Sequence, residues 1–529
     1  MKKYQKYAVK LTNKSKFKPN ADTEEINLLP SKAQKRPVYS TIDENFGFLN
    51  SIISSTIGLT ETKYELWNGK THIGVAYIQS LADKELISSH IIKPLIEGNV
   101  NDAITADIIP DLIRTRFIHI PDTKKSNMME EVIRSLYDGF TVIFSEDSNE
   151  TVLVGCKKIE KRSIEMPNNE VTVLASMDSF TEDLETNCSL IIRRLPTPDL
   201  HFEEFTAGRL SHTKIKVVWL EGIAHQIVID EIKKRIEKID VDNIDGIGPL
   251  IELIVEEPLS IFPNYRQTQR PDTVTRKLSD GYVAVFCSNS PFALVAPMFF
   301  TDNFKTMDDY SENFYIGSFL RFVRLLAFFL STTVCSLYVA FVAYNQTIVP
   351  PPLAVTIASG RNSVPFPTII EILFLSLTIT IIREASLRLP GSVGYFIGTL
   401  AAVVIGQSAV TGGYVSASVI IVIAISAISS YAISNSNFVY PARLLNYVMI
   451  LLAGMFGMFG VVNGIVLIIW HMVSLKSFGM PYLYPIVPFD KEAIKDSFIR
   501  APFKYLKNRP GILAHDNNQK VGARGKNVK

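Results

Sequence analysis

The residues of this chain that could do chemistry are too scattered to form a known type of active site. The 529-residue sequence contains no Walker A loop, no H-E-x-x-H motif and no G-x-S-x-G motif. Those spacings are typical of phosphate-binding loops, zinc peptidases and serine hydrolases. His212 and His225 are isolated, and Gly246-Ile-Gly248 lacks the third glycine of a dinucleotide-binding loop. We therefore predict that the protein is not an enzyme and has no cofactor.

The cysteines do not suggest a metal site either. The chain has four of them, and no two have the C-x-x-C spacing of a zinc site: Cys156, Cys188, Cys287 and Cys335. Scattered single cysteines are typical of small buried side chains in a reducing compartment. We predict no metal ligands and no disulfide framework.

Polar residues in an unusual setting occur in the C-terminal half. Between Leu325 and Leu475, His471 aside, only six residues are acidic or basic: Arg361, Glu371, Arg383, Glu384, Arg388 and Arg443. So long an apolar stretch predicts a bilayer-embedded region with several helices. A charge near mid-bilayer costs roughly 2.5–3.5 kcal/mol on insertion scales, so these six side chains should have partners or face a wet cavity.

One segment of this half is both small and polar. Residues 406–413 read GQSAVTGG. On a helix Gln407, Val410 and Thr411 share one face, and Val403 lies one turn below Gln407 on that face. A pore needs polar groups that face water and a narrow apolar ring that can close by dewetting. These four residues are therefore pore-lining candidates, and tight helix packing through the small residues is the alternative.

A second polar segment closes the predicted second span. Glu384 and Arg388 are four residues apart, so they share a helix face with the acid on the N-terminal side, which is the favourable order. The pair is either a charged collar at the cytosolic interface or an element that couples the membrane region to the soluble region.

The apolar runs predict the spans themselves. Pro350–Pro367 is predicted to be a long external loop or a re-entrant element. The predicted runs are 322–345, 368–387, 392–412, 415–434 and 440–474. The last run is too long for a single span. We therefore favour a tight pair of helices there and six crossings in all, and four crossings remain possible.

Basic residues set the predicted orientation. Lys305, Arg321 and Arg324 precede the first span, and basic residues again follow the last, from Lys491 onward. Positive charge favours the cytosolic side. Both termini are therefore predicted to be cytosolic, and the basic N-terminal tail could contact anionic lipid.

The soluble half contains an internal repeat at an offset of 142 residues. Val132 to Gly155 reads VIRSLYDGFTVIFSEDSNETVLVG, and Val274 to Pro297 reads VTRKLSDGYVAVFCSNSPFALVAP. The same offset pairs Val75–Ile87 with Val217–Ile229. A shared offset in two separated blocks indicates duplication, and each copy alternates strands with helices.

The predicted fold class is therefore an α/β cytosolic region of two duplicated subdomains plus an α-helical polytopic transmembrane domain. The predicted parts are a disordered basic tail (1–44), the two α/β subdomains (45–165 and 166–315), the transmembrane helical domain (316–476) and a basic cytosolic C-terminal tail (477–529).

Several separated strings together resemble the A subunit of bacterial spore germinant receptors, the GerA family. They occur in the family's order over roughly residues 170–510: FTEDLETNCSLIIRR (180–194), FPNYRQTQRPD (262–272), REASLRLPGSVG (383–394), VIGQSAV (404–410), SFGMPYLYPIVPF (477–489) and RAPFKYLKNRP (500–510).

The chain departs from the family pattern at several points. Residues 173–180 read VLASMDSF where the family has an Arg-Gly-Pro-Arg-like stretch, and 288–291 read SNSP where it has Asp-Gly-Ser-Pro. Where the family has Thr-Glu-Arg-Pro-Asp, this chain has Gln269 in place of the glutamate. Arg270 and Asp272 match the family pattern. These two residues are expected at a structural corner, where they cap helices or pair between subunits.

The resemblance implies a multi-pass protein of the spore inner membrane. It implies assembly with a permease-like B subunit, which binds the nutrient, and with a lipoprotein C subunit. It also implies a ring of identical A subunits, a pentamer, around a path for monovalent cations. The other possibilities are a secondary transporter with its own substrate, or a membrane-anchored scaffold subunit. Nothing predicts a nucleic-acid partner.

Overall fold

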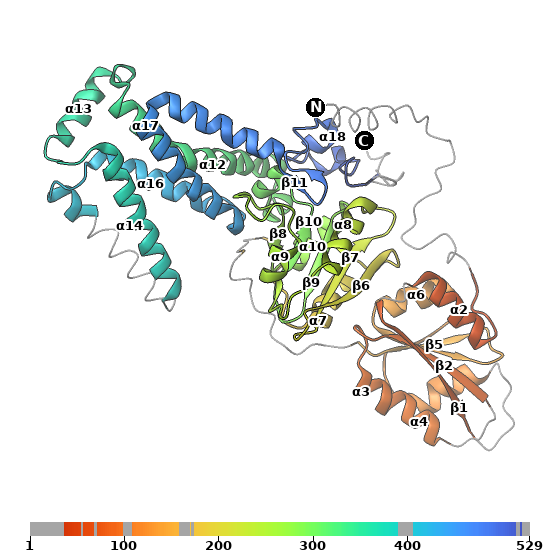
Figure 1. Ribbon diagram of the computed structural model, residues 1–529. Coiled ribbons are helices and arrows are strands. Elements are labelled where there is room, and N and C mark those ends of the chain that lie inside the picture. Colours follow the sequence, from red (N-terminus) through yellow and green to blue (C-terminus); the bar gives the residue numbers. More distant parts are fainter. Residues whose placement is uncertain are drawn as a thin grey trace.

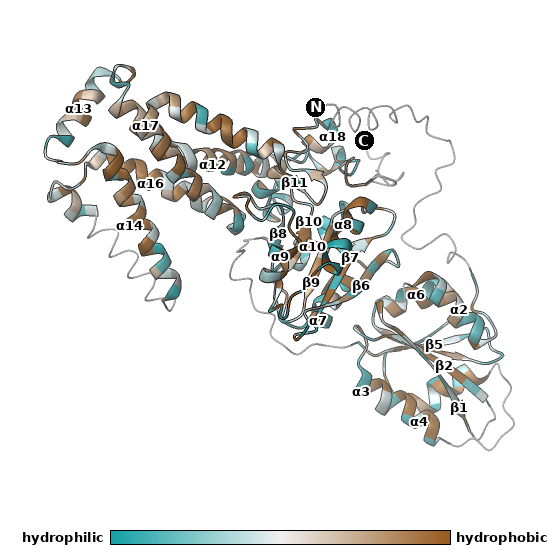
Figure 2. Ribbon diagram, viewed as in Figure 1, coloured by the Kyte–Doolittle hydropathy of each residue, from teal (hydrophilic) through white to brown (hydrophobic). Residues whose placement is uncertain are grey.

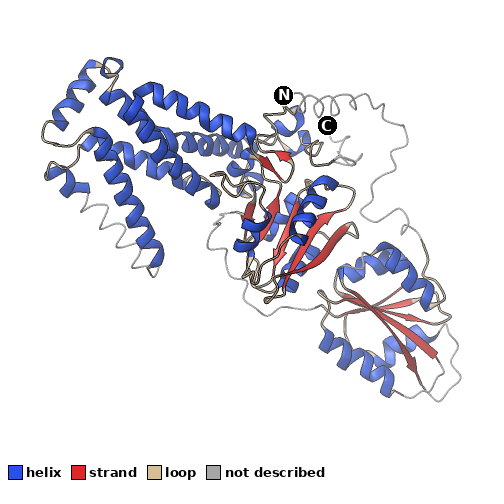
Figure 3. Cartoon of the chain, viewed as in Figure 1, coloured by secondary structure: helices blue, strands red, loops and turns tan. Residues whose placement is uncertain are grey.

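The computed structural model describes residues 36–53, 57–67, 71–98, 108–157, 170, 174–389, 406–514 and 519–520. Two sheet subdomains follow one another along the chain, and a group of long helices extends from the second (Figure 1). Each sheet carries its own helices (Figure 3). The fold is thus an α/β region of two similar antiparallel sheet subdomains joined to an apolar helical half, as predicted.

The first sheet has five strands in the order β1-β2-β4-β5-β3, and every neighbouring pair is antiparallel. Side chains alternate across it, because Val142 and Phe144 face one core while Ile143 faces the other. Helices α2 (Ile42–Ile52) and α6 (Met129–Tyr137) cover the first face. The strands are β1 (Leu59–Leu66), β2 (Thr71–Ile78), β3 (Thr123–Ser126), β4 (Phe140–Ser145) and β5 (Thr151–Gly155).

The other face of this sheet is covered by short helical segments. They alternate between α- and π-helical turns, and their apolar residues pack on Ile73, Val75 and Ile143. The segments are α3 (Lys84–Ile87), η2 (Ser88–Ile92), α4 (Lys93–Glu97), α5 (Ile109–Leu112) and η4 (Ile113–Phe117).

The second sheet repeats the arrangement in the order β6-β7-β9-β10-β8. Its strands are β6 (Leu200–Ala207), β7 (Thr213–Leu220), β8 (Arg266–Thr268), β9 (Val283–Cys287) and β10 (Ala293–Ala296). Its helices are α7 (Leu184–Arg194), α8 (Gln226–Glu237), α9 (Ile247–Ile254) and α10 (Pro271–Ser279).

The strand registers of the two sheets confirm the duplication. Ile73 pairs with Ser145 in the first sheet, and Ile215 pairs with Cys287 in the second, so both partners shift by the predicted 142 residues. Helices α6 and α10 end in the same Asp-Gly turn. In both turns the glycine has a positive φ, +79° at Gly139 and +96° at Gly281, where a side chain would be strained.

A buried asparagine recurs at the same offset. The Nδ2 of Asn45 donates to the carbonyl of Tyr39, and its Oδ1 accepts from the Tyr39 amide at 3.0 Å. Asn187 makes the same pair of bonds with Thr181. Each asparagine thereby satisfies the backbone of the segment that enters its helix, which apolar side chains could not do.

Both predicted tails are partly folded. Residues 36–44 belong to the first subdomain, because Val38 and Ile42 are buried and the Val38 amide donates to the carbonyl of Asn127. The tail predicted over 1–44 is therefore too long at its C-terminal end. The segment 476–514 is also ordered, and it buries Phe478 and Tyr482 against the rest of the chain. Its apolar side chains, which a count of basic charge overlooks, explain this difference.

The helical half begins with α12 (Phe314–Ala343), which starts eight residues before the predicted start at 322. The Asn313 side chain caps it by accepting from the Tyr315 amide. After α12, the proline-rich segment that was predicted to be an external loop or a re-entrant element holds an exposed helix. The remaining helices are α13 (Pro351–Arg361), α14 (Thr368–Arg388), residues 406–411, α16 (Ala417–Tyr431) and α17 (Ser436–Ser474). Most of the predicted third helix, 392–412, lies outside the described residues.

The last apolar run doubles back on itself. Gly457 in α17 has non-helical angles, φ 59° and ψ −139°. A Cβ on Gly460 would lie 2.0 Å from the Leu452 carbonyl oxygen, which is impossible along one straight helix. At the other end, Phe438 and His471 both contact the ring of Phe262, with centroids 5.8 and 6.0 Å away. The run is a helical hairpin, as the tight-pair prediction required.

The six charges of the apolar half all have partners. The ion pairs are Arg361–Glu371 at 3.4 Å and Arg388–Glu384 at 2.9 Å. Arg383 and Arg443 both lie over the ring of Tyr431, with their guanidinium carbons 4.5 and 5.6 Å from its centroid. The expectation that such charges need partners is met.

Two of the described helices are long and apolar enough to cross a membrane, α12 and α17, with mean hydropathy of 2.1 and 2.2. Apolar residues dominate α12, α14, α16 and α17 (Figure 2). Many of their large side chains, including Phe319, Phe322, Phe459 and Trp470, are exposed on the single chain. Such a surface fits lipid or other protein subunits.

Candidate functional site

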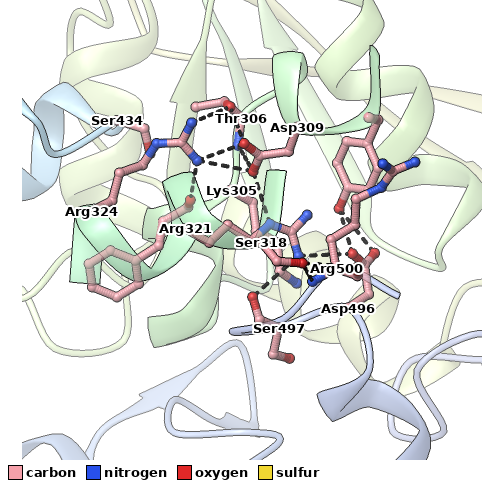
Figure 4. Close-up of polar contacts among 12 residues, drawn as sticks. Lys305, Thr306, Asp309, Ser318, Arg321, Arg324, Ser434, Asp496, Ser497 and Arg500 are labelled. Atoms are coloured by element: carbon pink, nitrogen blue, oxygen red, sulfur yellow. Dashed lines mark hydrogen bonds and ion pairs between the residues drawn. The ribbon is translucent and has the colours of Figure 1, made fainter. Parts of the chain in front are cut away.

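The most highly connected polar site lies where α12 leaves the second subdomain. Helix α11 (Asp308–Ser311), the first turns of α12 and the C-terminal segment meet there (Figure 4). We call Asp309, Arg321, Arg324, Asp496 and Arg500 the junction cluster.

A glycine sets how closely these elements approach. A Cβ on Gly317 would lie 2.8 Å from the backbone oxygen of Asp309. Backbone cannot yield as a flexible side chain can, so α11 packs directly on α12 only because residue 317 has no side chain. This contact brings Asp309 beside Arg321 and Arg324, which are three residues apart and share one face of α12.

Asp309 is fully buried and accepts bonds from both arginines. The Nε of Arg321 lies 2.9 Å from one carboxylate oxygen, and Nη1 of Arg324 lies 2.8 and 3.0 Å from the two oxygens. Thr306 adds its amide and its hydroxyl at 3.1 and 3.0 Å. A carboxylate with this many donors is well compensated for its burial.

Arg321 also reaches the C-terminal segment. Its Nη1 donates to Asp496 at 3.0 Å, and the hydroxyl of Tyr310 donates to both oxygens of that carboxylate. Burial alone would raise the pKa of Asp496, but Lys305 and Arg321 lower it to about 2. Asp496 is therefore ionised at neutral pH, and Arg321 bridges two carboxylates from segments nearly two hundred residues apart in sequence.

Arg500 completes the junction through backbone groups. Its Nη1 donates to the carbonyl of Glu312 at 2.9 Å. Its amide donates to the Ser318 hydroxyl, and that hydroxyl donates to the Arg500 carbonyl. The C-terminal segment is thus fixed to the first turns of α12 by both charge and backbone hydrogen bonds.

An aromatic cluster continues the junction into the helical half. Phe300 and Phe304 belong to η5 (Phe300–Phe304), which leaves the second sheet. Both rings pack edge-on against Phe328 of α12 and Phe438 of α17, with centroids 5.8–6.0 Å apart. The second subdomain, α12 and α17 therefore share one apolar core beside the ion pairs.

The arrangement can fix the relative positions of separate parts of the chain. Within the described ranges no group of three or more His, Cys, Asp or Glu side chains is placed to hold a metal ion. The four cysteines are all buried and unpaired. What the junction cluster can do is hold a soluble subdomain, a membrane helix and the C-terminal segment as one body.

The structure places Arg270 and Asp272 at the start of α10, some way along the chain from the junction cluster. Both are buried, and Arg270 donates to Asp272 through Nε at 3.1 Å and Nη2 at 2.6 Å. Arg270 also donates to the carbonyls of Glu170 and Ser176. The pair therefore joins the helix start to the segment that enters the subdomain, within one chain.

The other candidates lie on exposed surfaces. Glu384 and Arg388 form their ion pair in the last turns of α14. Gln407, Val410 and Thr411 lie on the described helical residues 406–411 and are all exposed, Val410 by 37%. Val403 falls outside the described residues. The structure brings none of these residues to the junction cluster, and their roles remain predictions.

Sequence reasoning missed the junction cluster. It used Arg321 and Arg324 only as indicators of membrane orientation and gave no role to Asp309 or Asp496. The available signal was an arginine pair three residues apart at the start of an apolar helix, preceded by Asp308, Asp309 and Glu312. Such charges at the end of a span are usually assigned to the lipid interface, which is why the packing partner was overlooked.

Comparison with known proteins gives consistent matches along the chain. The profile of the Bacillus/Clostridium GerA spore germination protein family matches residues 42–512. The chain is 33% identical over 451 residues to spore germination protein KA of Bacillus subtilis. The aligned region covers 85% of this chain and 82% of that protein.

Two further curated relatives are similar over comparable lengths. The uncharacterized membrane protein YfkQ of Bacillus subtilis is 32% identical over 491 residues, with 93% of this chain and 95% of that protein covered. Spore germination protein GerLA of Bacillus cereus is 33% identical over 462 residues, with 87% and 93% covered.

Among solved structures, the N-terminal domain of the A subunit of the Bacillus megaterium spore germinant receptor GerK3 matches with a TM-score of 0.40 and 22% identity. The match covers 50% of this chain and 98% of that one.

Proposed function

Because the chain belongs to the GerA family of Bacillus and Clostridium spore germination proteins, we propose that it is the membrane subunit of a nutrient germinant receptor in spores. In this proposal several copies form a nutrient-gated ion channel, and the release of cations through it triggers germination. The channel lies in the spore inner membrane, with both termini in the cytosol and six crossings.

The proposal assigns separate tasks to separate chains. A permease-like B subunit binds the nutrient, a lipoprotein C subunit completes the complex, and a ring of five copies of this chain surrounds the ion path. The chain itself then needs a way to pass a change in its surroundings to its membrane helices.

The junction cluster is the observation that best supports this role. Arg321 is fully buried between Asp309 and Asp496, so α12 cannot shift independently of the second subdomain or of the C-terminal segment. A movement of the soluble region would therefore reorient α12, and with it the hairpin α17 that packs along it.

The exposed face of helix 406–411 supports the position of the path. Gln407, Val410 and Thr411 are all exposed on the single chain, and among the described residues the Thr411 hydroxyl donates to the carbonyls of Gln407 and Ser408 in its own helix. An exposed polar face in an apolar region is costly in lipid. In a ring, this face lines the central path, and Val410 from each subunit forms the apolar constriction.

Replacing Val410 by alanine should open that constriction. Smaller side chains widen the ring once per subunit, so the expected result is ion leak and germination without nutrient. Ion release and protein level should be measured together in mutant spores. Val448→Ala, an exposed valine on α17, is the matched control and should behave as wild type. Normal level with unchanged leak and nutrient response in Val410→Ala would remove Val410 from the gate.

A further inference from the structure

A small cavity lies between the second subdomain and the C-terminal segment, next to the junction cluster. Its volume is about 70 Å³. Helix α10, the segment after η5 and the C-terminal segment supply its walls. The charged groups that line it include Arg266, Arg276, Lys277, Lys305, Asp496 and Lys520.

One group of ion pairs on its wall has a surplus positive charge. Lys277 and Lys305 share the single carboxylate of Asp302, at 2.7 and 2.9 Å. Arg266 has only Glu170 as a carboxylate partner, at 3.4 Å. Among the described residues this group therefore has three cations and two carboxylates.

A second group lies beside the cavity and has the same imbalance, and Arg276 and Asp496 are its members that line the cavity. Arg276 and Arg321 both pair with Asp496, and Arg321 and Arg324 both pair with Asp309. This again gives three cations and two carboxylates. The other charged residues of the wall are balanced, because Lys520 pairs with Asp280 and Glu492 pairs with Lys495. Counted over the described lining residues alone, five are basic and three are acidic, which is a surplus of two positive charges.

Buried charge without a counter-charge is unfavourable. Burial lowers the pKa of Lys277 to about 8, although Asp302 opposes the shift. The Nε of Arg266, on a side chain that is 8% exposed, has no hydrogen-bond acceptor in the described ranges. The cavity wall therefore carries positive charge that the described carboxylates do not balance, and a hydrogen-bond donor that has no acceptor among the described residues.

We propose that this cavity binds a small doubly charged oxyanion of the phosphate class. Two negative charges would balance the two surplus cations. The cavity of about 70 Å³ is large enough for one small tetrahedral oxyanion, because a single water needs only about 10–15 Å³ of cavity volume. Arginine and lysine side chains are the usual ligands for such groups.

The bound anion would join two separate parts of the chain. Arg266, Lys277 and Lys305 belong to the second subdomain and its exit, whereas Asp496 and Lys520 belong to the C-terminal segment. An oxyanion between them would stabilise the docked position of that segment beside α12. This inference concerns ligand binding by the single chain and does not depend on whether the chain forms a channel.

The test measures the Tm of the purified full-length chain in detergent, in potassium phosphate and in potassium chloride of equal ionic strength. Binding to the folded state should raise the Tm in phosphate by about 3 °C or more. Lys277→Gln removes one surplus charge, so it should be at least as stable as wild type in chloride and should lose most of the phosphate effect. Lys305→Gln should also lose most of the phosphate effect, and provides a second variant if the first does not fold.

Lys63→Gln is the charge-matched control, because Lys63 pairs with Asp43 in the first subdomain and neither residue lines the cavity, and it should keep the wild-type response. A second arm compares the chain in nanodiscs of phosphatidic acid, a phosphomonoester, and of phosphatidylcholine, both in phosphate-free buffer. A shift with phosphatidic acid alone would support the site with a lipid headgroup as the source. No shift in either arm, or an equal phosphate shift in wild type and both cavity variants, would overturn the proposal.

Discussion

Replacing Asp309 by alanine should be among the most damaging single changes in this chain. It would leave Arg321 and the largely buried Arg324 without a shared carboxylate, and removing one partner of a buried pair typically costs about 3–5 kcal/mol. We expect a lower Tm of the purified protein and a lower level in spores. Because Arg321 would then hold only Asp496, the nutrient response per molecule should fall as well.

The matched control is Asp240→Ala. Asp240 forms an equally short double contact with Arg209, but both side chains are more than 60% exposed. Exposed pairs contribute little to stability, so this variant should retain the wild-type Tm and response. A wild-type Tm in Asp309→Ala would show that the junction cluster does not hold the chain together.

Replacing Gly457 by valine should break the helical hairpin of α17. Residue 457 has φ 59° and ψ −139°, a region that only glycine adopts readily. A Cβ there would also lie 2.9 Å from Cγ of Tyr344. Strain and overpacking together should cost about 2–6 kcal/mol, and the Tm of the detergent-solubilised protein should fall accordingly.

Gly360→Val is the control for this change. Gly360 lies in α13, has no positive φ, and has nothing within 4 Å of the position of an added Cβ. Valine should therefore be tolerated there. If Gly457→Val and Gly360→Val gave the same Tm as wild type, the sharp turn at Gly457 would not be needed for the fold.

The duplication could be predicted because the matching residues of the two copies follow one another in sequence without a gap. Strand register has a period of two, so a repeat with an ungapped offset fixes which residues face each core. That is why Val75 and Val217 take equivalent places opposite Ile143 and Val285. The hairpin of α17 could also be predicted, because the run is too long for one span and carries glycines at its centre.

The junction cluster could not be predicted from local pattern. Asp309 and Asp496 lie 187 residues apart, and only the fold brings both to Arg321. Charge at the end of a span has the same appearance in sequence whether it contacts lipid headgroups or a buried carboxylate. The helix at 351–361 was obscured for a similar local reason, since prolines favour the first turn of a helix as well as a loop.

The mass of the assembled protein tests the proposed ring most directly. The chain should be purified from membranes in detergent together with its partner subunits, and the copy number of this 59.2-kDa chain should be measured by native mass spectrometry. The account predicts several copies, five in the proposed assembly, in a closed ring, because an ion path on a symmetry axis requires a ring of identical subunits. A single copy in the intact, nutrient-responsive complex would contradict it and would favour a transporter or a scaffold subunit.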